Sequence, residues 1–336
     1  MKRVSIKDIA QAVGVSTALV SYVLNNKEKE ARVGQKIAEV IRVKARELGY
    51  QPNQIAKSLK TGRSQTIGLI VADISNPFFA NIARTIEDEA KKYNYTVIFG
   101  SSDEAADKSQ NLINILLERQ VDGFIIAPTE GSEEQIRSLQ DQRIPFVLID
   151  RYFPDIQTNF VVTNNYQASY QAVRHLAGQH RKKIAMIAYK SELVHMKERE
   201  RGYLDALKDS GLDSDLNLVK EISYNFIQRE VGEVMGQLMR GHPDIDAFFF
   251  GSNALSMGGL RYLNRNNYRI PETISVVCFD ESEAFDLFYA PLTFVNQPLL
   301  EMGKEAVRIL AEQISGKQPQ LDQVFVDSAL IVREKH

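Results

Sequence analysis

The sequence predicts an α/β protein in two parts, an all-α head at the N-terminus and a two-lobed body built on parallel sheets. Apolar residues recur at helical spacing over the first fifty residues, and from Thr66 onward short apolar runs alternate with helical stretches. Residues 1–63 hold 13 Lys and Arg against 5 Asp and Glu, whereas the rest holds 28 against 38. A basic head on an acidic body is typical of a polyanion-binding module joined to an acidic domain, although a solvated charged face would show the same balance.

The first two helices of the head are predicted from their caps. Ser5 and Asp8 have the spacing of a capping box, and Gly14 can adopt the left-handed conformation that ends a helix. Ser16 can cap a second helix directly afterwards. The inward faces of the two helices are expected to contain Ile6, Ile9, Ala10, Val13, Val20, Val23 and Leu24. This arrangement is a helix-turn-helix, though an ordinary helical hairpin would have the same pattern.

A third helix is expected from about Val33 to Leu48, with Gly49 as its stop. Its inward residues are predicted to be Val33, Ile37, Val40, Ile41 and Leu48, which complete a three-helix core. The outward face of the second helix carries small and polar side chains, which let a helix approach base edges in DNA: Thr17, Ala18, Ser21, Tyr22 and Asn25.

A hinge is predicted between the head and the body. Pro52 ends the third helix firmly, and a short helix can restart at Asn53, with Lys57 and Lys60 available for phosphates. Because it has fewer than two turns, we expect it to form only when DNA and a partner chain hold it. A plain linker is the alternative.

The body is predicted to contain parallel α/β structure repeated in two lobes. Strands are expected at residues 67–72, 96–100, 123–127 and 145–149, then at 183–188, 246–251 and 274–280, with helices near 197–210, 227–240 and 254–266. Open α/β sheets bind ligands at the carboxyl ends of their strands. Polar residues follow several of these strands: Asp73, Asn76, Asp150, Arg151, Asp280 and Glu281. Such residues often merely cap the next helix, and this alternative stays open for each of them.

Several classes of protein are not expected. The start of the chain lacks an apolar signal core, and no stretch of about 18 apolar residues occurs, so neither secretion nor membrane spanning is predicted. The lone Cys278 cannot form an intramolecular disulfide or a thiolate metal site, which fits a reducing cytoplasm. We find no nucleophile elbow, Walker A loop or dinucleotide fingerprint, and the histidines form no metal-spaced pair. We therefore expect no enzyme, cofactor or metal, with an α/β enzyme as the least favoured alternative.

The head and the body both resemble the LacI/GalR family of bacterial transcriptional regulators. In the head the matching motifs are SIKDIA at 5–10, GVST at 14–17 and VSYVLN at 20–25, and IAKSLK at 55–60 looks like the family's hinge helix. In the body they are DISNPFF at 73–79, VDG at 121–123, VVCFD at 276–280, PLT at 291–293 and QP at 297–298. The resemblance covers nearly the whole chain and implies a periplasmic-binding-protein-like body.

The resemblance also implies roles for individual residues. It assigns base reading to Thr17, Ala18 and Tyr22, and a minor-groove wedge to Leu59. Other expected DNA contacts are Ser5, Ser16, Ser21, Asn25, Lys57 and Lys60. The effector contacts carried over are Phe78, Phe79, Arg151, His195, Arg199, Phe226, Asn253 and Asp280.

Two departures from the family pattern bear on the ligands. Tyr22 replaces an Arg or His that is commoner there, and it cannot form the bidentate arginine–guanine pair. Ser252-Asn253 replaces Asn-Asp, which removes a carboxylate from the expected pocket. The residues implied by the resemblance suit a polyol, and the lost carboxylate raises the hypothesis of a more acidic effector such as a sugar acid or a sugar phosphate.

The predicted domains are a DNA-binding head at 1–50, a hinge at 51–63 and an effector-binding and dimerisation domain at 64–336. Lobe one is expected at about 64–162 and 294–322, and lobe two at about 163–293 and 323–336. The resemblance implies a cytoplasmic, homodimeric repressor of pseudo-palindromic double-stranded operator DNA, switched by a sugar or sugar derivative. The alternatives are an activator and a cytoplasmic sugar-binding protein.

Overall fold

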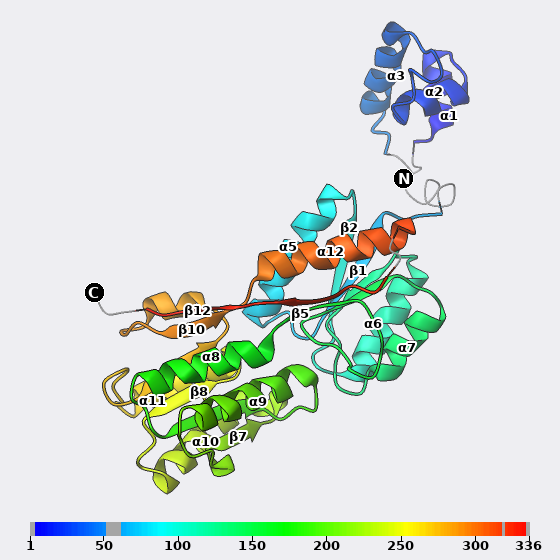
Figure 1. The fold of residues 1–336 in the computed structure, drawn as a ribbon. Coiled ribbons are helices and arrows are strands. Elements are labelled where there is room, and N and C mark those ends of the chain that lie inside the picture. The colour runs from blue at the N-terminus through cyan, green and yellow to red at the C-terminus, as the bar shows by residue number, and fades with distance from the viewer. Residues whose placement is uncertain (1–3, 52–61, 318–319, 334–336) are drawn as a thin grey trace. The chain divides into compact units, whose positions relative to one another are not determined.

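The computed structural model describes residues 4–51, 62–317 and 320–333 (Figure 1). It divides into two compact units, Met1–Ser64 and Gln65–His336. The expected hinge residues Lys57, Leu59 and Lys60 lie outside the described residues.

The head contains the three expected helices, α1 (Ile6–Val13), α2 (Thr17–Leu24) and α3 (Gln35–Glu47). The capping box is confirmed, because the Ser5 side chain accepts from the Asp8 N–H and the Asp8 carboxylate accepts from the Ser5 N–H at 2.7 Å. Gly14 has a φ of 75° and ends α1 as predicted. Ile9, Val20, Val23 and Ile41 are fully buried between the helices, which confirms the three-helix core.

The prediction that Val40 and Leu48 face this core is wrong. Val40 is 50% exposed and Leu48 is 37% exposed. The buried stripe of α3 is Ala38, Ile41 and Ala45, at the spacing of a single helix face. The prediction from sequence selected large apolar residues, whereas the closely packed side of α3 is lined partly by small alanines.

The described residues of the body form two sheets of six strands. The first has the order β11-β5-β4-β3-β1-β2 and the second the order β12-β10-β9-β8-β6-β7. The strands of the first sheet are β1 (Thr66–Val71), β2 (Thr96–Ser101), β3 (Phe124–Ile126), β4 (Phe146–Ile149), β5 (Phe160–Thr163) and β11 (Gln323–Val326). Those of the second are β6 (Ile184–Tyr189), β7 (Val219–Ile222), β8 (Ala247–Phe250), β9 (Ser275–Phe279), β10 (Thr293–Asn296) and β12 (Ala329–Ile331). All pairs are parallel except β10 with β12, so the expectation of parallel sheets holds apart from one edge strand.

Helices cover both faces of each sheet, as Figure 1 shows. In lobe one, α5 (Pro77–Lys92) and α12 (Leu299–Ser315) share one face, and α6 (Ala106–Glu118) and α7 (Glu133–Asp141) share the other. In lobe two the pairs are α8 (Asn165–Gly178) with α9 (Val194–Asp209), and α10 (Ile227–Gly241) with α11 (Asn253–Arg265). Short 3₁₀ turns are η1 (Leu216–Leu218), η2 (Tyr224–Phe226) and η3 (Glu283–Leu287). Both faces of each sheet are therefore buried except at exposed edge strands such as β2, which explains the continuous apolar strands in the sequence.

The chain passes between the lobes after β5, after β10 and after β11. The expected boundaries at 294 and 323 are therefore wrong by the length of one short strand each. β10 pairs with β9 in lobe two, and β11 pairs with β5 in lobe one. The sequence could not assign these strands, because a four-residue strand does not reveal which sheet it joins. No helix in the described parts of the chain is long and apolar enough to cross a membrane.

Candidate functional site

The outward face of α2 is the candidate DNA-reading surface. Thr17, Ala18 and Tyr22 are all exposed, and Tyr22 is exposed by 45%. The Ser16 side chain accepts from the Leu19 N–H at 3.2 Å and so holds the N-terminus of α2. Asn25 donates to the Ser21 carbonyl at 2.7 Å at the other end. Two of the expected DNA contacts, Ser5 and Ser16, thus already cap helices, so their first role is to hold the reading helix in place.

A cavity of about 290 Å³ lies between the two lobes of the body. Lobe one contributes Asp103, Glu104, Ala105, Glu130 and Arg151, and lobe two contributes Tyr189, Lys190, Ser191, Leu193, His195, Met196 and Tyr224. These residues follow the carboxyl ends of β2, β3, β4, β6 and β7, where parallel α/β sheets bind ligands.

Arg151 is the buried cation of lobe one. It donates to both Glu104 carboxylate oxygens at 2.6 Å each, and to Asp150 at 3.3 Å. Its guanidinium carbon lies 5.7 Å from the centre of the Phe79 ring. Burial opposes its charge, but Glu104 and Asp150 outweigh burial and hold the pKa of Arg151 above its ordinary value. Arg151 is therefore a paired cation on the cavity wall.

Arg199 is the buried cation of lobe two. Its Nε donates to the Asn165 side chain at 2.8 Å, its Nη1 donates to the Gly251 carbonyl at 2.7 Å, and its carbon lies 3.6 Å from the centre of the Phe279 ring. Burial lowers the pKa of Arg199, although Asp280 and Asp150 act against it. Its contacts join α8, α9 and the end of β8.

Asp280 lies at the end of β9 with a φ of 72°. Its carboxylate accepts from Gln297 Nε2 at 2.5 Å and from the Asn253 N–H at 3.3 Å. Burial raises the pKa of Asp280, against Arg199 and these two hydrogen bonds. Asp280 therefore ties α11 to the segment that returns to lobe one.

His195 is 5% exposed and lines the cavity from the start of α9. Its Nδ1 is a buried atom without a hydrogen-bond partner among the described residues. Burial, together with Arg151 and Arg199, lowers the pKa of His195 well below its ordinary value, so the ring is neutral near pH 7. A neutral ring with an unsatisfied nitrogen is suited to bind a ligand hydroxyl.

Phe226 is not among the residues that line this cavity. Its side chain is 53% exposed and does not line the cavity, whereas Tyr224, two residues earlier, does. A 3₁₀ turn has three residues per turn, so side chains two apart point in different directions. The Tyr224 hydroxyl also donates to Asp73, which links the lobes across the cavity. Recognition of β7 as a strand would have directed attention to Tyr224, because it follows that strand.

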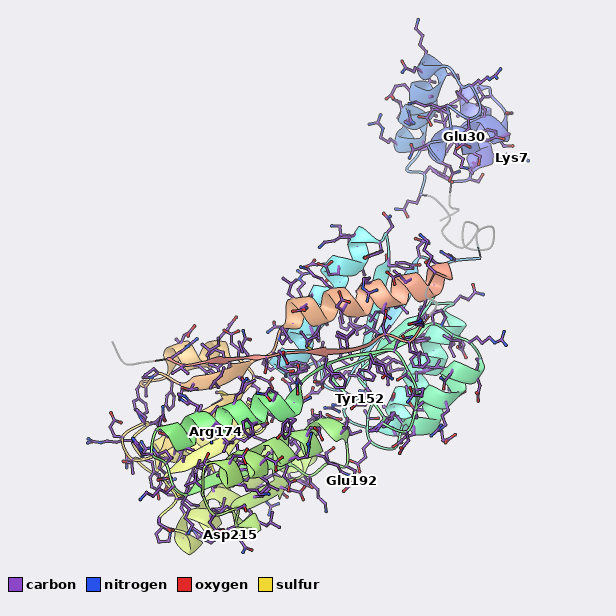
Figure 2. The ribbon with its side chains drawn as sticks, viewed as in Figure 1. Lys7, Glu30, Tyr152, Arg174, Glu192 and Asp215 are labelled. Atoms are coloured by element: carbon purple, nitrogen blue, oxygen red, sulfur yellow. The ribbon has the colours of Figure 1, made fainter. Side chains whose placement is uncertain are left out.

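The other predicted effector residues lie around this cavity. Arg151 and His195 line it, whereas Phe78 and Asp280 line a second hollow of about 660 Å³ beside the N-terminus of α5. The Phe79 ring lies near the Arg151 guanidinium, Arg199 is buried and is not among the lining residues, and the Asn253 N–H donates to Asp280. Among the described residues we find no group of His, Cys, Asp and Glu arranged to hold a metal. The side chains of the body are drawn in Figure 2, in which Glu192 marks the loop that leads into α9.

Comparison with known proteins finds a matching family model for each of the two units. The family model of bacterial regulatory proteins, lacI family, matches residues 5–53, and the model of periplasmic binding proteins and the sugar binding domain of the LacI family matches residues 64–332. The ribose operon repressor of Halalkalibacterium halodurans is 31% identical over 98% of this chain and 96% of its own.

Two solved structures cover almost the whole chain. The transcriptional regulator CelR in complex with cellobiose has 27% identity and a TM-score of 0.74, over 99% of each chain. The lac repressor dimer bound to operator and the anti-inducer ONPF has a TM-score of 0.84 over 99% of this chain and 98% of its own. At 21% identity this second likeness is one of fold.

The head, the two-lobed body and these matches define a DNA-binding transcriptional regulator with a ligand-binding body, not an enzyme. The chain belongs to the LacI family of bacterial regulatory proteins.

Proposed function

We propose that this regulator is a cytoplasmic repressor whose affinity for operator DNA is switched by a small polyhydroxy effector bound between its lobes. The observation that carries the proposal is the cavity of about 290 Å³ lined by both lobes, with the buried, neutral His195 among its lining residues. Tyr189, Tyr224 and Arg151 supply a further apolar and hydrogen-bonding surface, as a sugar ring with hydroxyls requires. Two of the relatives described above also have a sugar in their names.

For DNA, we assign base reading to the exposed Thr17, Ala18 and Tyr22 of α2. Tyr22 can contact a thymine methyl or hydrogen-bond a base, but it cannot replace the bidentate contact of Arg with guanine. The supporting contacts assigned in the head are Ser5, Ser16, Ser21 and Asn25. Lys57, Lys60 and the wedge Leu59 remain predictions from the sequence.

We propose that the body forms a two-fold dimer through the open edge of lobe one. β2 is the edge strand of the first sheet, and its Phe99 is 63% exposed. Ile98, Tyr93 and Ile74 are also exposed apolar side chains beside it, and the Ile74 N–H donates to Ser101 at the end of β2. Exposed apolar edge strands are usually covered, and a two-fold dimer would place two heads on a pseudo-palindromic operator.

The switch would be a change in the angle between the lobes, because the cavity walls belong to both of them. The coupling between effector and operator has to be reciprocal in free energy.

The test is a selection of bound sequences from random DNA, repeated with ribose, cellobiose and xylulose as probes, with calorimetry of each sugar on the full chain. We expect a two-fold symmetric site, and one sugar that both binds the body and changes operator affinity. An asymmetric half-site footprint would contradict the dimer. A sugar that binds without any change in operator affinity would contradict the switch.

A further inference from the structure

The charged groups around the cavity are unevenly balanced. Two buried guanidiniums, those of Arg151 and Arg199, face three carboxylates: Glu104, Asp150 and Asp280. Because Glu104 holds Arg151 in a bidentate pair, with both distances at 2.6 Å, the cation on the cavity wall is already neutralised before any ligand arrives. An anionic ligand would have to displace this carboxylate or lie against it.

The mouth of the cavity adds further negative charge. A neighbouring hollow of about 310 Å³ shares Glu130 and Leu193 with the cavity. Its other charged lining residues are the acidic Glu133, Asp155 and Glu192 and the basic Arg137 and Lys197, so acidic residues are in excess. Lys197 of this hollow pairs with Glu192 at 2.5 Å. Lys190 also lines the cavity, but it is exposed, so solvent and salt screen its charge.

The remaining wall is mixed. Tyr189, Ser191, His195 and Tyr224 are polar and uncharged, Asp103 is acidic, and the apolar lining residues are Ala105, Leu193 and Met196. The neutral His195, Tyr189 and Tyr224 line the same space. These groups can bind hydroxyls without a formal charge on the ligand.

From this arrangement we infer that the effector cavity selects uncharged ligands over their anionic esters and acids, and that Glu104 is the specificity-determining residue because it neutralises Arg151. This inference rests on the proposed function of the cavity. It replaces the hypothesis of an acidic effector. That hypothesis rested on the carboxylate lost at Asn253, and the sequence alone did not reveal the pairing of Glu104 with Arg151.

The test uses anionic probes, so it does not require the natural effector. The thermal unfolding of the full chain is measured with ribose 5-phosphate and with inorganic phosphate, at constant ionic strength. Wild type should show no stabilisation by either probe at millimolar concentration. Glu104→Gln removes the carboxylate but keeps an amide of similar size, so the two Nη groups of Arg151 lose their anionic partner while Nε keeps Asp150 at 3.3 Å. We expect the apparent dissociation constant for ribose 5-phosphate to fall at least about tenfold in this variant, because one charge a few ångströms away has been removed.

Glu305→Gln is the matched control. Glu305 pairs with Arg308 on α12, away from the residues that line the cavity, and Arg308 keeps Glu312 at 2.9 Å. This variant should respond to the probes as wild type does. Glu130→Gln is the second variant. Glu130 is an exposed lining residue of the cavity, and its replacement leaves the pair between Arg151 and Glu104 intact. This variant keeps the test valid even if Glu104→Gln does not fold. We expect it to tighten ribose 5-phosphate binding about twofold to threefold.

The inference is overturned if wild type is stabilised by ribose 5-phosphate, or if neither cavity variant responds to it more strongly than Glu305→Gln. Failure of the proposed function would look different. In that case no neutral sugar would change operator affinity, whatever the anionic probes do to the variants.

Discussion

Replacement of Arg199 by Met should destabilise the body more than any surface charge change. Arg199 is 4% exposed and donates to Asn165 at 2.8 Å and to Gly251 at 2.7 Å. Its loss leaves both acceptors without this donor, and the buried Asp280 and Asp150 lose a nearby cation. Removal of one partner from a buried charged network costs about 3–5 kcal/mol.

The expected shift can be measured by calorimetry of the full chain. For a domain of this size each kcal/mol lowers the melting temperature by roughly 2–4 °C, so Arg199→Met should lower that of the body by about 10 °C. Arg199→Lys keeps the charge but loses the fork that reaches two acceptors, so its decrease should be about half as large.

Arg201→Met is the control, because Arg201 lies on the same helix but is exposed. It pairs with Glu198 at 2.5 Å and lies over Tyr166, and an exposed pair of this kind contributes about 0–1 kcal/mol. If Arg199→Met lowered the melting temperature no more than Arg201→Met does, the argument that Arg199 connects the helices around the cavity would be refuted.

Three further predictions concern the cavity and the head. Burial, Arg151 and Arg199 hold the pKa of His195 below its unfolded value, so the unfolded chain takes up more protons as the pH falls below about 6.5 and stability is lost there. Denaturant titrations between neutral and mildly acidic pH should show a shallower loss for His195→Gln, and equal slopes would contradict the buried neutral ring. Ser5→Ala should destabilise the head by about 1 kcal/mol in thermal unfolding, because it removes the cap of α1, and an unchanged head transition would argue against that role. Tyr22→Arg should shift one position of each selected half-site toward guanine by about 1–3 kcal/mol, and an unchanged preferred sequence would exclude Tyr22 from base reading.

Much of the fold was predictable from neighbours in the sequence. The caps at Ser5, Gly14 and Ser16 depend on residues within four positions of one another, so the helices of the head followed from local pattern. Six of the seven expected strands of the body were found because both of their faces are buried, which leaves continuous apolar runs, and the exposed edge strand β2 was found because it is also apolar. Five strands were missed: β5, β7, β10, β11 and β12. β7 and β11 have exposed residues and little such signal, whereas β5 and β10 are buried but only four residues long.

The candidate site was predictable only in part. Arg151 and Asp280 follow strong strands and were found by the rule that ligands bind at strand ends. Tyr224 was missed because it follows a weak strand and because a 3₁₀ turn decides which side chain faces inward. Glu104 was missed because its importance comes from Arg151, 47 residues away in the chain.

The sequence by itself therefore determined the class of protein, the helix-turn-helix head and the two α/β lobes, since each depends on periodicity, caps and motifs that are local in the chain. Only the tertiary structure decided which sheet received β10 and β11, which aromatic side chain lined the cavity, and which carboxylate neutralised Arg151. These features depend on distances between segments that are remote in sequence, and no local pattern contains those distances.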